Sequence, residues 1–279
     1  MIRIRRMAEG DVELGMRLKA QANWNQLEMD WRRALALGPG GCFVAELDGV
    51  AVGTVATCRF GLVAWIAMML VDTAVRRHGV GTALMRQALD HLDDAGVRTV
   101  RLDATPLGQP LYEKLGFTVE YGLARYAGVP HAGAGQDPSI GLLQPGDMEE
   151  VIRLDREAAA TDRENLLRQL EWEMPNTIWI ARHAGKVVGY VTGRPGANAY
   201  HVGPCVADSV LGTRLLATAW QRCAGQRVYI DVPDANEAAV AAVIATGLSM
   251  QRPFARMCRG PHLKDWPGRI WACFGPEKG

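Results

Sequence analysis

The sequence consists of two similar halves, and this repeat limits the fold more than any other feature. Residues 43–57 (FVAELDGVAVGTVAT) align without a gap to residues 179–193 (WIARHAGKVVGYVTG), with two glycines of each segment in register. Further on, residues 101–105 (RLDAT) parallel residues 229–233 (YIDVP), and LGF precedes ARY at the same distance at which TGL precedes ARM. An ordered internal repeat predicts two similar domains that arose from one duplicated unit.

A segment rich in glycine, alanine and proline separates the two halves. This segment, VPHAGAGQDPSIG, has few large apolar residues and is typical of a linker. We therefore expect a first domain at residues 1–128, a linker at 129–140 and a second domain at 141–279. A chain of 279 residues has about the length of two domains.

Local patterns predict alternating strands and helices. The alternation of IRIRR predicts a strand at residues 2–6, and Asp48-Gly49 between two β-rich runs predicts a hairpin. Asp11 is expected to cap one helix and Asn25 the next. The other expected elements are buried strands at 63–72 and 99–105, a long helix after residue 79, a short helix at 108–116, a strand at 117–128, helices at 147–158 and 163–174, a hairpin at 177–196, and a strand followed by a helix at 201–220.

The composition is that of a soluble globular protein and disfavours several classes. The chain is 48% hydrophobic and 22% charged, and its net charge of +1 lacks the basic excess of a nucleic-acid scaffold. The longest apolar run, residues 61–71, has about half the length needed to cross a bilayer. The N-terminus lacks the apolar core of a signal peptide. We expect a cytoplasmic protein without a nucleic-acid or membrane partner.

The six cysteines are scattered through the chain. They form no CxxC pair, and His201 and Cys205 lie four residues apart without a second pair of ligands. A zinc site requires closer ligand spacing. We therefore expect reduced, mostly buried thiols and no metal.

A basic, glycine-containing loop precedes the long helix. After the apolar AMMLV come Arg76, Arg77, His78, Gly79, Val80, Gly81 and Thr82. Glycines allow a ligand to approach the backbone, and the free N–H groups of a helix start attract anions. Arginine adds donors suited to phosphate oxygens. The alternative is a plain helix-entry turn with solvated arginines.

The pattern of this loop is R-x-x-G-x-G. It matches neither GxxxxGK[ST] nor the GxGxxG of dinucleotide-binding folds. Downstream, TPLGQPLYEKLGF (residues 105–117) contains Tyr112, Gly116 and Phe117 in an N-x-x-A-x-x-x-Y-x-x-x-G-F-like segment, with Thr105 for the usual Asn and Gly108 for the usual Ala. In both features, residues 1–128 resemble the Gcn5-related N-acetyltransferase (GNAT) superfamily. The resemblance implies an α/β fold of two tandem GNAT-like domains, each with a mixed central sheet flanked by helices.

The resemblance also implies a site for acetyl-CoA as co-substrate. The backbone of Met69, Leu70 and Val71 would pair with the pantetheine arm, with an N–H near Leu70 polarising the acyl carbonyl. The loop from Arg76 to Thr82 would bind the pyrophosphate, and Thr105 would contribute to the same cofactor site. Tyr112 matches the family tyrosine that protonates the leaving thiolate; its alternative is a core aromatic.

The acceptor site is less well defined by the sequence. In the superfamily the early helices cover this site, which makes Asn23, Trp24 and Glu28 candidates, with Glu28 as a possible base. Trp24 and Trp65 are candidates for shaping the acceptor pocket. The alternative for both tryptophans is that they pack in the core. The alternative for Glu28 is that it is a solvent-exposed helix residue.

The second half lacks the residues of the first site. Its loop, VADSVLGTRLL, has one glycine and the acidic Asp208, which would repel a pyrophosphate. Asn236 and Ala239 match the family segment, whereas Val243 occupies the tyrosine position. We expect a degenerate GNAT-like domain that does not bind acyl-CoA and that walls the acceptor site, supports a homodimer or binds a regulator. Its polar candidates are His201, Asp231 and Arg256, each with a structural hydrogen-bonding role as the alternative.

These observations lead to three functional hypotheses. The first is an N-acetyltransferase that acts by direct attack of the primary amine of a small molecule on acetyl-CoA. The second is a protein-directed acetyltransferase, and the third is a non-catalytic, acyl-CoA-responsive regulatory module. The intact loop together with Tyr112 favours an enzyme.

Overall fold

The computed structural model describes residues 1–131 and 137–279, so residues 132–136 of the expected linker lie outside the described residues. The first half contains β1 (Ile2–Arg6), α1 (Val12–Gln21), α2 (Glu28–Leu37), β2 (Cys42–Leu47), β3 (Val50–Phe60), β4 (Val63–Val71), α3 (Val80–Asp94), β5 (Thr99–Ala104), α4 (Gln109–Lys114) and β6 (Thr118–Gly128). The second half contains β7 (Ile140–Leu142), α5 (Met148–Ala159), α6 (Glu164–Glu173), β8 (Trp179–His183), β9 (Lys186–Arg194), β10 (Tyr200–Ala207), α7 (Ser209–Arg222), β11 (Val228–Pro233), α8 (Glu237–Ala245), β12 (Ser249–Arg259) and β13 (Ile270–Ala272).

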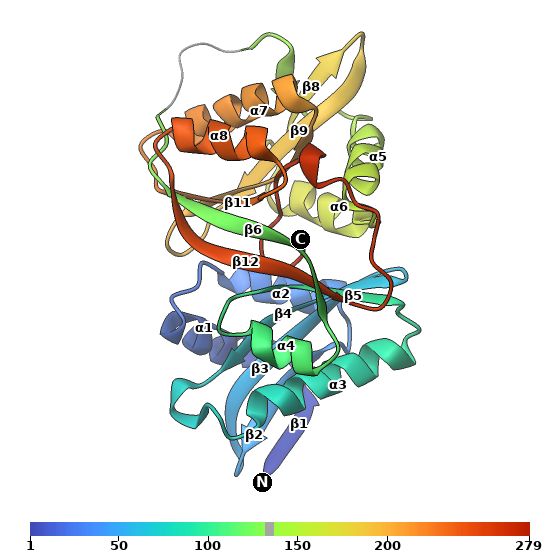
Figure 1. Cartoon of the computed structure of the whole chain (residues 1–279), viewed down its shortest axis with the longest axis vertical. Coiled ribbons are helices and arrows are strands. Elements are labelled where there is room, and N and C mark those ends of the chain that lie inside the picture. Colours follow the sequence, from blue (N-terminus) through green and yellow to red (C-terminus); the bar gives the residue numbers. More distant parts are fainter. Residues whose placement is uncertain (132–136) are drawn as a thin grey trace.

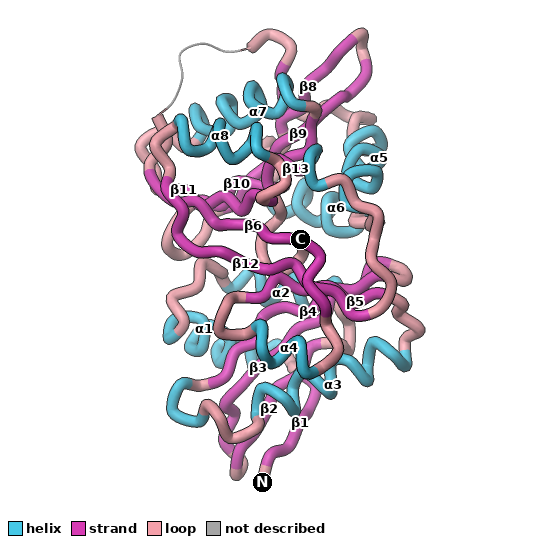
Figure 2. Tube along the Cα trace, viewed as in Figure 1, coloured by secondary structure: helices cyan, strands magenta, loops and turns pink. Residues whose placement is uncertain are grey.

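The mixed sheets of the two halves join into one. Within the described residues, thirteen strands form a sheet in the order β1-β2-β3-β4-β5-β12-β6-β11-β10-β9-β8-β7, and β13 pairs with β10. Figure 2 shows this sheet running through the whole molecule with helices on both sides. Only the pairs β4–β5 and β10–β11 are parallel among the described strands. The expected mixed α/β architecture in tandem is confirmed.

The halves exchange their last long strands at the centre of the sheet. β12 of the second half lies between β5 and β6 of the first, and β6 lies between β12 and β11. In Figure 1 these two strands, green and red, run side by side across the middle of the molecule. Nothing in the sequence indicated this exchange, which requires pairing between residues 100 or more positions apart.

The helices cover the two faces of the sheet separately. Phe43 and Ala45 pack with α3 in one apolar cluster, whereas Cys42 and Val44 pack with α1 and α2 in another. This division follows from the strand period of two, which directs successive side chains to opposite faces. In the second half, α7 and α8 belong to one cluster and α5 and α6 to another.

Most of the expected elements are present, with one difference at the start of α2. Asn25 does not cap α2, whose N-cap is Leu27. Its side chain instead accepts hydrogen bonds from the backbone N–H groups of Asn198 and Ala199, at 2.8 and 3.0 Å. Asn25 therefore ties the loop before α2 to the second half, and its role as a helix cap was predicted wrongly.

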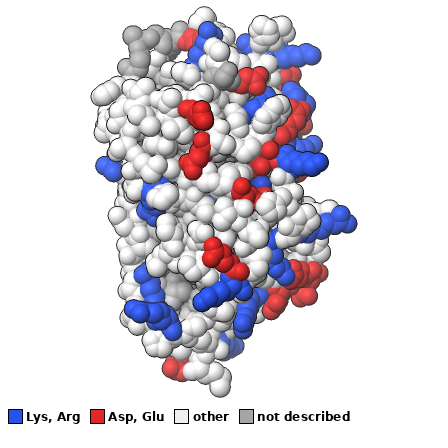
Figure 3. All heavy atoms as spheres, viewed as in Figure 1, with Lys and Arg blue, Asp and Glu red and all other residues white. Residues whose placement is uncertain are grey.

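The surface and the cysteines agree with the composition. All six cysteines are free and buried, as expected. Figure 3 shows acidic and basic side chains intermingled along the right-hand edge of the molecule, with large uncharged areas between them. No helix within the described residues is long and apolar enough to cross a membrane.

Candidate active site

A pocket of about 930 Å³ lies where β4 and β5 separate. Val63–Trp65 of β4 pair with Thr99–Arg101 of β5, and the two parallel strands are not paired beyond these residues. Their C-terminal parts therefore diverge. The pocket is lined by residues of both halves, from the start of α3 to β12 and the C-terminal segment. It therefore connects the two faces of the sheet.

The predicted loop forms one end of this pocket. Arg77 has a φ of 67° and Gly79 a φ of 83°, both in the left-handed region, and α3 starts immediately afterwards at Val80. The first N–H groups of a helix have no intrahelical acceptor, and here no side chain at the N-cap accepts from them. The residues of the loop that line the pocket are Arg76, Arg77, Gly79, Val80, Gly81 and Thr82. This arrangement of N–H groups and guanidinium groups suits an anion such as a pyrophosphate.

His78 is placed differently from the rest of the loop. It is not among the residues that line the pocket. Its Nδ1 lies 3.0 Å from the carbonyl oxygen of Arg76, and the side chain is exposed. The structure therefore does not bring this predicted residue into the pocket.

β4 carries a bulge in the middle of the pocket. Thr54 pairs with Leu70 and Ala56 with Ala67, so two residues of β4 face one of β3. At the bulge, Met68 has a φ of 51°, and its carbonyl oxygen accepts a hydrogen bond from Thr54 Oγ1 at 2.9 Å. A bulge leaves backbone groups unpaired and re-aims them. The predicted Met69, Leu70 and Val71 all line the pocket at this point.

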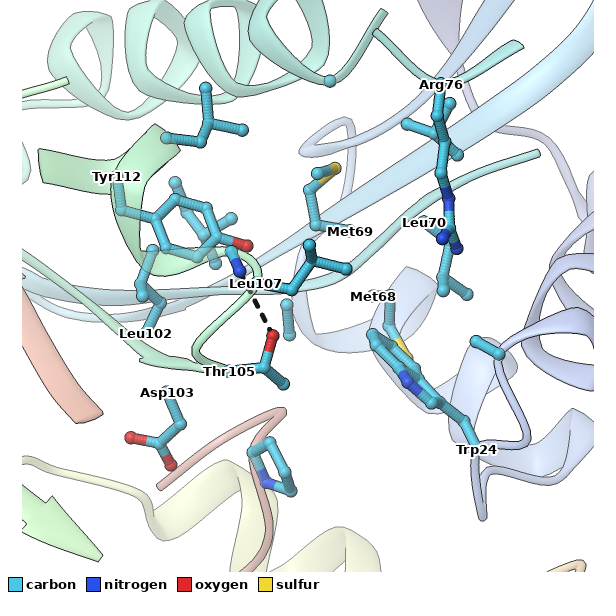
Figure 4. A pocket seen from close by; sticks show the side chains of 18 of the residues that line it. Trp24, Met68, Met69, Leu70, Arg76, Leu102, Asp103, Thr105, Leu107 and Tyr112 are labelled. Atoms are coloured by element: carbon cyan, nitrogen blue, oxygen red, sulfur yellow. Dashed lines mark hydrogen bonds between the residues drawn. The ribbon is translucent and has the colours of Figure 1, made fainter. Parts of the chain in front are cut away.

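Tyr112 reaches the pocket from α4. Figure 4 shows its ring on the opposite side of the pocket from Arg76, with Met69 between them. The ring packs edge-on against Phe117 with centroids 6.1 Å apart. Burial raises the pKa of the Tyr112 phenol to about 12, so the group is a proton donor at neutral pH.

The turn before α4 explains one departure from the family pattern. A Cβ at Gly108 would lie 3.0 Å from the Tyr112 ring, so an alanine there would crowd this ring. Thr105, which replaces the usual asparagine, accepts a hydrogen bond at Oγ1 from the N–H of Gly108 at 3.3 Å (Figure 4). Thr105, which was predicted to contribute to the cofactor site, also lines the pocket.

Of the four predicted acceptor-site residues, one lies in the pocket. Trp24 lines it and projects into it in Figure 4. Asn23 Oδ1 instead accepts a hydrogen bond from Asn198 Nδ2 at 3.2 Å. Trp65 is buried beneath Arg256, whose Cζ lies 4.7 Å from the ring centroid.

Glu28 also lies away from the pocket. It is exposed, and it is ion-paired with Arg32 one helical turn further along α2. The carboxylates that line the pocket are Asp103 and Glu277. Arg256 donates to both oxygens of Asp103, each at 2.9 Å, and Arg194 is ion-paired with Glu277.

The pocket has a wall that the sequence did not reveal. This wall comprises Gln26, Asp103, Arg125, Arg252, Phe254, Pro276 and Glu277. Most of these residues come from the exchanged strands or the C-terminal segment, whose positions beside the pocket depend on contacts between distant parts of the chain. The repeated ARY and ARM segments mark Arg125 and Arg256 of these strands, but not Arg252 or the pocket that it lines.

Comparisons with known proteins agree with this geometry. Residues 13–117 match the model described as "Acetyltransferase (GNAT) family", and residues 151–272 match "Acetyltransferase (GNAT) domain". The two matches together cover most of the chain. The chain belongs to the GNAT family. Family members transfer acyl groups from acyl-CoA, so the protein is a tandem GNAT acyltransferase.

Three similar proteins illustrate this relationship. An uncharacterized N-acetyltransferase of Bacillus subtilis (strain 168), YitH, is 26% identical over 198 residues, 70% of this chain and 69% of the relative. A holothin acyltransferase of Pseudoalteromonas sp. (strain SANK 73390) is 23% identical over 253 residues, 90% of this chain and 85% of the relative. The crystal structure of a putative acetyltransferase from Pyrococcus horikoshii has a TM-score of 0.86 and 24% identity, and the match covers 100% of this chain and 96% of that chain.

The second GNAT half fills its own equivalent of the pocket. β13 pairs with β10 at Cys205 and Val206, and Cys273 donates a backbone hydrogen bond to Asp231 of β11 at 2.8 Å. The segment thus lies between the two parallel strands where the first half has its pocket. Trp271 on this segment is fully buried and packs on α7 so closely that a Cβ at Gly212 would overlap its ring.

The polar candidates of the second GNAT half are buried in ion pairs or next to one. Asp231 accepts two hydrogen bonds from Arg125, and Arg256 donates two to Asp103. His201 Nε2 lies 3.9 Å from Asp231 Oδ2, and burial together with nearby arginines lowers the pKa of this histidine well below its ordinary value.

One group of side chains outside the pocket has the composition of a metal site. Glu120, Cys258 and His262 place their ligand atoms within 4.8 Å of one another. However, Arg101 Nη2 donates to Glu120 Oε1 at 2.9 Å, and His262 is exposed. The guanidinium already neutralises the carboxylate that a cation would require.

Proposed function

We propose that this GNAT protein transfers an acetyl group from acetyl-CoA to the primary amine of a small molecule. The observation that carries the proposal is the continuous pocket that joins an anion-binding helix start, a bulged strand and Tyr112. Each of these features matches one part of the reaction: binding of the donor, polarisation of the carbonyl and protonation of the leaving group.

The donor would occupy the gap between β4 and β5. The pyrophosphate of acetyl-CoA would bind the N–H groups at the start of α3 and the guanidinium groups of Arg76 and Arg77. The pantetheine arm would extend along the unpaired edge of Met69–Val71 in the manner of an added strand. A backbone N–H near Leu70 would donate to the acyl carbonyl oxygen, on which negative charge develops during attack.

The chemical step is a direct transfer within a ternary complex. The amine nitrogen attacks the acyl carbon, the C–S bond breaks, and Tyr112 donates its proton to the departing thiolate. The proton lost by the amine passes to water or to Asp103, a carboxylate of the pocket wall. Glu28 is not well placed for this role, because it lies away from the pocket.

The second half would serve as a wall rather than as a second catalytic unit. Residues 1–128 would carry the transferase site, while Trp271 and β13 occupy the equivalent gap of the second half. The second half contributes Arg252, Phe254 and Glu277 to the pocket of the first. This contribution favours a small acceptor over a polypeptide, because side chains of the second half occupy the acceptor side of the pocket.

Release of free CoA tests this function. Acetyl-CoA would be incubated with a panel of primary amines, and thiol release would be measured for wild-type protein and for Tyr112→Phe. We expect turnover with at least one small amine that falls sharply in the variant. Tight acetyl-CoA binding without turnover on any amine would instead support the regulatory module, and turnover on peptides alone would support a protein acetyltransferase.

A further inference from the structure

Two arginines lie directly opposite each other in the pocket wall. In the register of β6 and β12, Arg252 is the cross-strand partner of Arg125. Both guanidinium groups pack against the Phe254 ring, with Cζ at 5.6 Å from its centroid for Arg125 and 5.9 Å for Arg252. Like charges directly opposite each other in a sheet are destabilising. A nearby anion would reduce the repulsion between these two guanidinium groups.

Only one of these two arginines has such an anion. Arg125 donates from Nε and Nη2 to Asp231, at 2.7 and 2.8 Å. Within residues 1–131 and 137–279, no ion pair or hydrogen bond from Arg252 to a carboxylate is formed, although its side chain is about half-buried. Burial and the neighbouring Arg125 lower the pKa of Arg252, which is the electrostatic mark of a cation without enough negative charge nearby.

The unpaired guanidinium is at the acceptor side of the pocket. β12 pairs with β5 only from Ala255 onward, so Arg252 lies beyond the end of β5, where the pocket opens. Phe254 packs in the apolar cluster that contains α5. This cluster lies on the opposite face of the sheet from the cluster that contains α3, the helix that begins at the expected pyrophosphate loop. Arg252 therefore faces the pocket from the side away from the expected phosphates of the donor.

The charges along this level of the sheet form an incomplete row. Asp231, Arg125 and Arg252 follow one another across β11, β6 and β12, in the order negative, positive, positive. The next position in the row is the pocket itself. A ligand carboxylate there would complete the alternation and relieve the repulsion between the arginines.

We propose that Arg252 binds a carboxylate of the acceptor, so that the acceptor class is an amine that carries an acidic group, such as an amino acid. This inference rests on the proposed acyl transfer. A guanidinium presents two parallel N–H donors to a carboxylate, and partial burial strengthens the interaction. The rings of Phe254 and Trp24 border the pocket and offer apolar contact to the carbon skeleton between the two groups.

Matched acceptor pairs provide the test. The kcat/KM for acetyl-CoA-dependent acetylation would be measured with amino acids and with the amines that remain after their decarboxylation, for example lysine and cadaverine or tyrosine and tyramine. We expect wild-type protein to prefer the acid by at least about 10-fold, in line with a charged hydrogen-bonded pair. Arg252→Gln should reduce this preference to less than about threefold, mainly through KM.

Arg227→Gln serves as the matched control. Arg227 is exposed, lies outside the pocket and has its Cζ 5.9 Å from the Tyr229 centroid, so its loss removes the same charge and a similar ring contact. We expect the control to keep the wild-type preference. Turnover without a preference for acids, or a preference that survives Arg252→Gln, would overturn the carboxylate site and leave the acyltransferase proposal intact.

The carboxylate could also belong to the acyl donor. A preference of wild-type protein for succinyl-CoA over acetyl-CoA that is lost in Arg252→Gln, with no preference among acceptors, would overturn the assignment to the acceptor.

A binding measurement keeps the inference testable if no amine is turned over. The melting temperature would be measured with sodium glutamate against sodium chloride at equal ionic strength. We expect glutamate to raise the melting temperature of wild-type protein but not of Arg252→Gln, whose melting temperature without anion should exceed that of wild type by about 1–3 °C. Equal responses of the two proteins would contradict the site. Absence of turnover with this binding result would refute only the proposed transfer.

Discussion

Arg125 of the first half binds both carboxylate oxygens of Asp231 of the second half, at 2.7 and 2.8 Å. The reciprocal pair joins Arg256 to Asp103, with both distances at 2.9 Å. These four residues occupy equivalent positions of the internal repeat, in the ARY and ARM segments and in RLDAT and YIDVP. Each half thus supplies one arginine and one aspartate, and the strand exchange places them together at the interface.

Loss of one partner should destabilise the protein. Asp231→Asn leaves Arg125 buried without a full counter-charge, and we expect a decrease of about 3–5 kcal/mol in the free energy of unfolding, measured by urea denaturation. The double variant Asp231→Leu with Arg125→Met should recover much of this loss, because it removes both buried charges. A change below about 0.5 kcal/mol for Asp231→Asn would show that the pair is not needed for the interface.

Glu277 should make the stability of the protein depend on acid pH. Burial alone would raise the pKa of Glu277, but Arg194 and Lys278 outweigh it and lower the pKa below the ordinary 4.5. A carboxyl group with a lowered folded pKa stabilises the protein above its unfolded pKa and loses this contribution as the pH falls below it.

The variant Glu277→Gln tests this dependence. We expect it to be less stable than wild type at pH 7, and the difference should shrink as the pH falls below about 4.5. The measurement is a series of urea denaturation curves between pH 3 and pH 7, with the exposed Glu13→Gln as control. A difference that stays constant over this range would argue against a charged Glu277.

The chain should bind one molecule of CoA. The first half has an open gap between β4 and β5, whereas β13 fills the gap of the second half. Isothermal titration calorimetry with CoA should therefore give a stoichiometry of one per chain. A stoichiometry of two would show that the second half also binds CoA.

Gly79 should be needed for donor binding. Its φ of 83° is unfavourable for a residue with a branched side chain, and the backbone must approach the pyrophosphate closely. We expect Gly79→Val to weaken CoA binding at least about 10-fold. Gly96→Val is the control, because Gly96 has a φ of 72° at the other end of α3 and lies outside the pocket. Equal affinities of both variants would mean that the loop is not the phosphate site.

Tyr112 should act on the chemical step rather than on binding. We expect Tyr112→Phe to reduce kcat about 10- to 100-fold while the Kd for CoA changes less than about threefold. Tyr126→Phe removes the same atom from a buried ring outside the pocket and serves as control. A normal kcat in Tyr112→Phe would assign thiolate protonation to another group.

The pH profile gives a second readout on Tyr112. Because burial raises the pKa of this phenol to about 12, the proton-donating form persists through pH 10. Because the folded pKa of Tyr112 is raised, its neutral phenol stabilises the folded state at pH values below 10, the ordinary tyrosine pKa. This stabilisation is lost as the pH rises from 10 to 12. In wild-type protein we expect no alkaline loss of kcat from this group between pH 8 and 10. A loss with an apparent pKa below 10 that disappears in Tyr112→Phe would contradict this assignment.

Short-range patterns led to the proposed donor side of the site. The spacing of Gly79, Gly81 and Tyr112, together with the alternation of the strands, predicted the helix start and the flanking strands. The resemblance to the GNAT superfamily implied most of the residues that line the pocket there. His78 is the exception, because the turn that positions its neighbours directs its ring outside the pocket. Local backbone preferences act over a few residues, so the sequence expresses them directly.

Short-range patterns did not predict the residues on the acceptor side of the pocket. Asn23, Trp65 and Glu28 were inferred from family geometry, and the structure places all three outside the pocket. Gln26 and Glu277 lie 251 positions apart and are joined by a hydrogen bond of 3.2 Å. No local signal marks such a pair, because neither residue's own segment depends on it.

The sequence by itself determined that this protein consists of two related GNAT halves and that only the first retains the loop and the tyrosine of a donor site. The tertiary structure alone decided that the halves exchange strands, that Trp271 fills the second gap and that Arg252 lines the first pocket with no carboxylate partner among the described residues. Helix starts and strand alternation arise from interactions between near neighbours in the chain. Strand exchange and the placement of buried charges depend on which distant segments find the best pairing and packing.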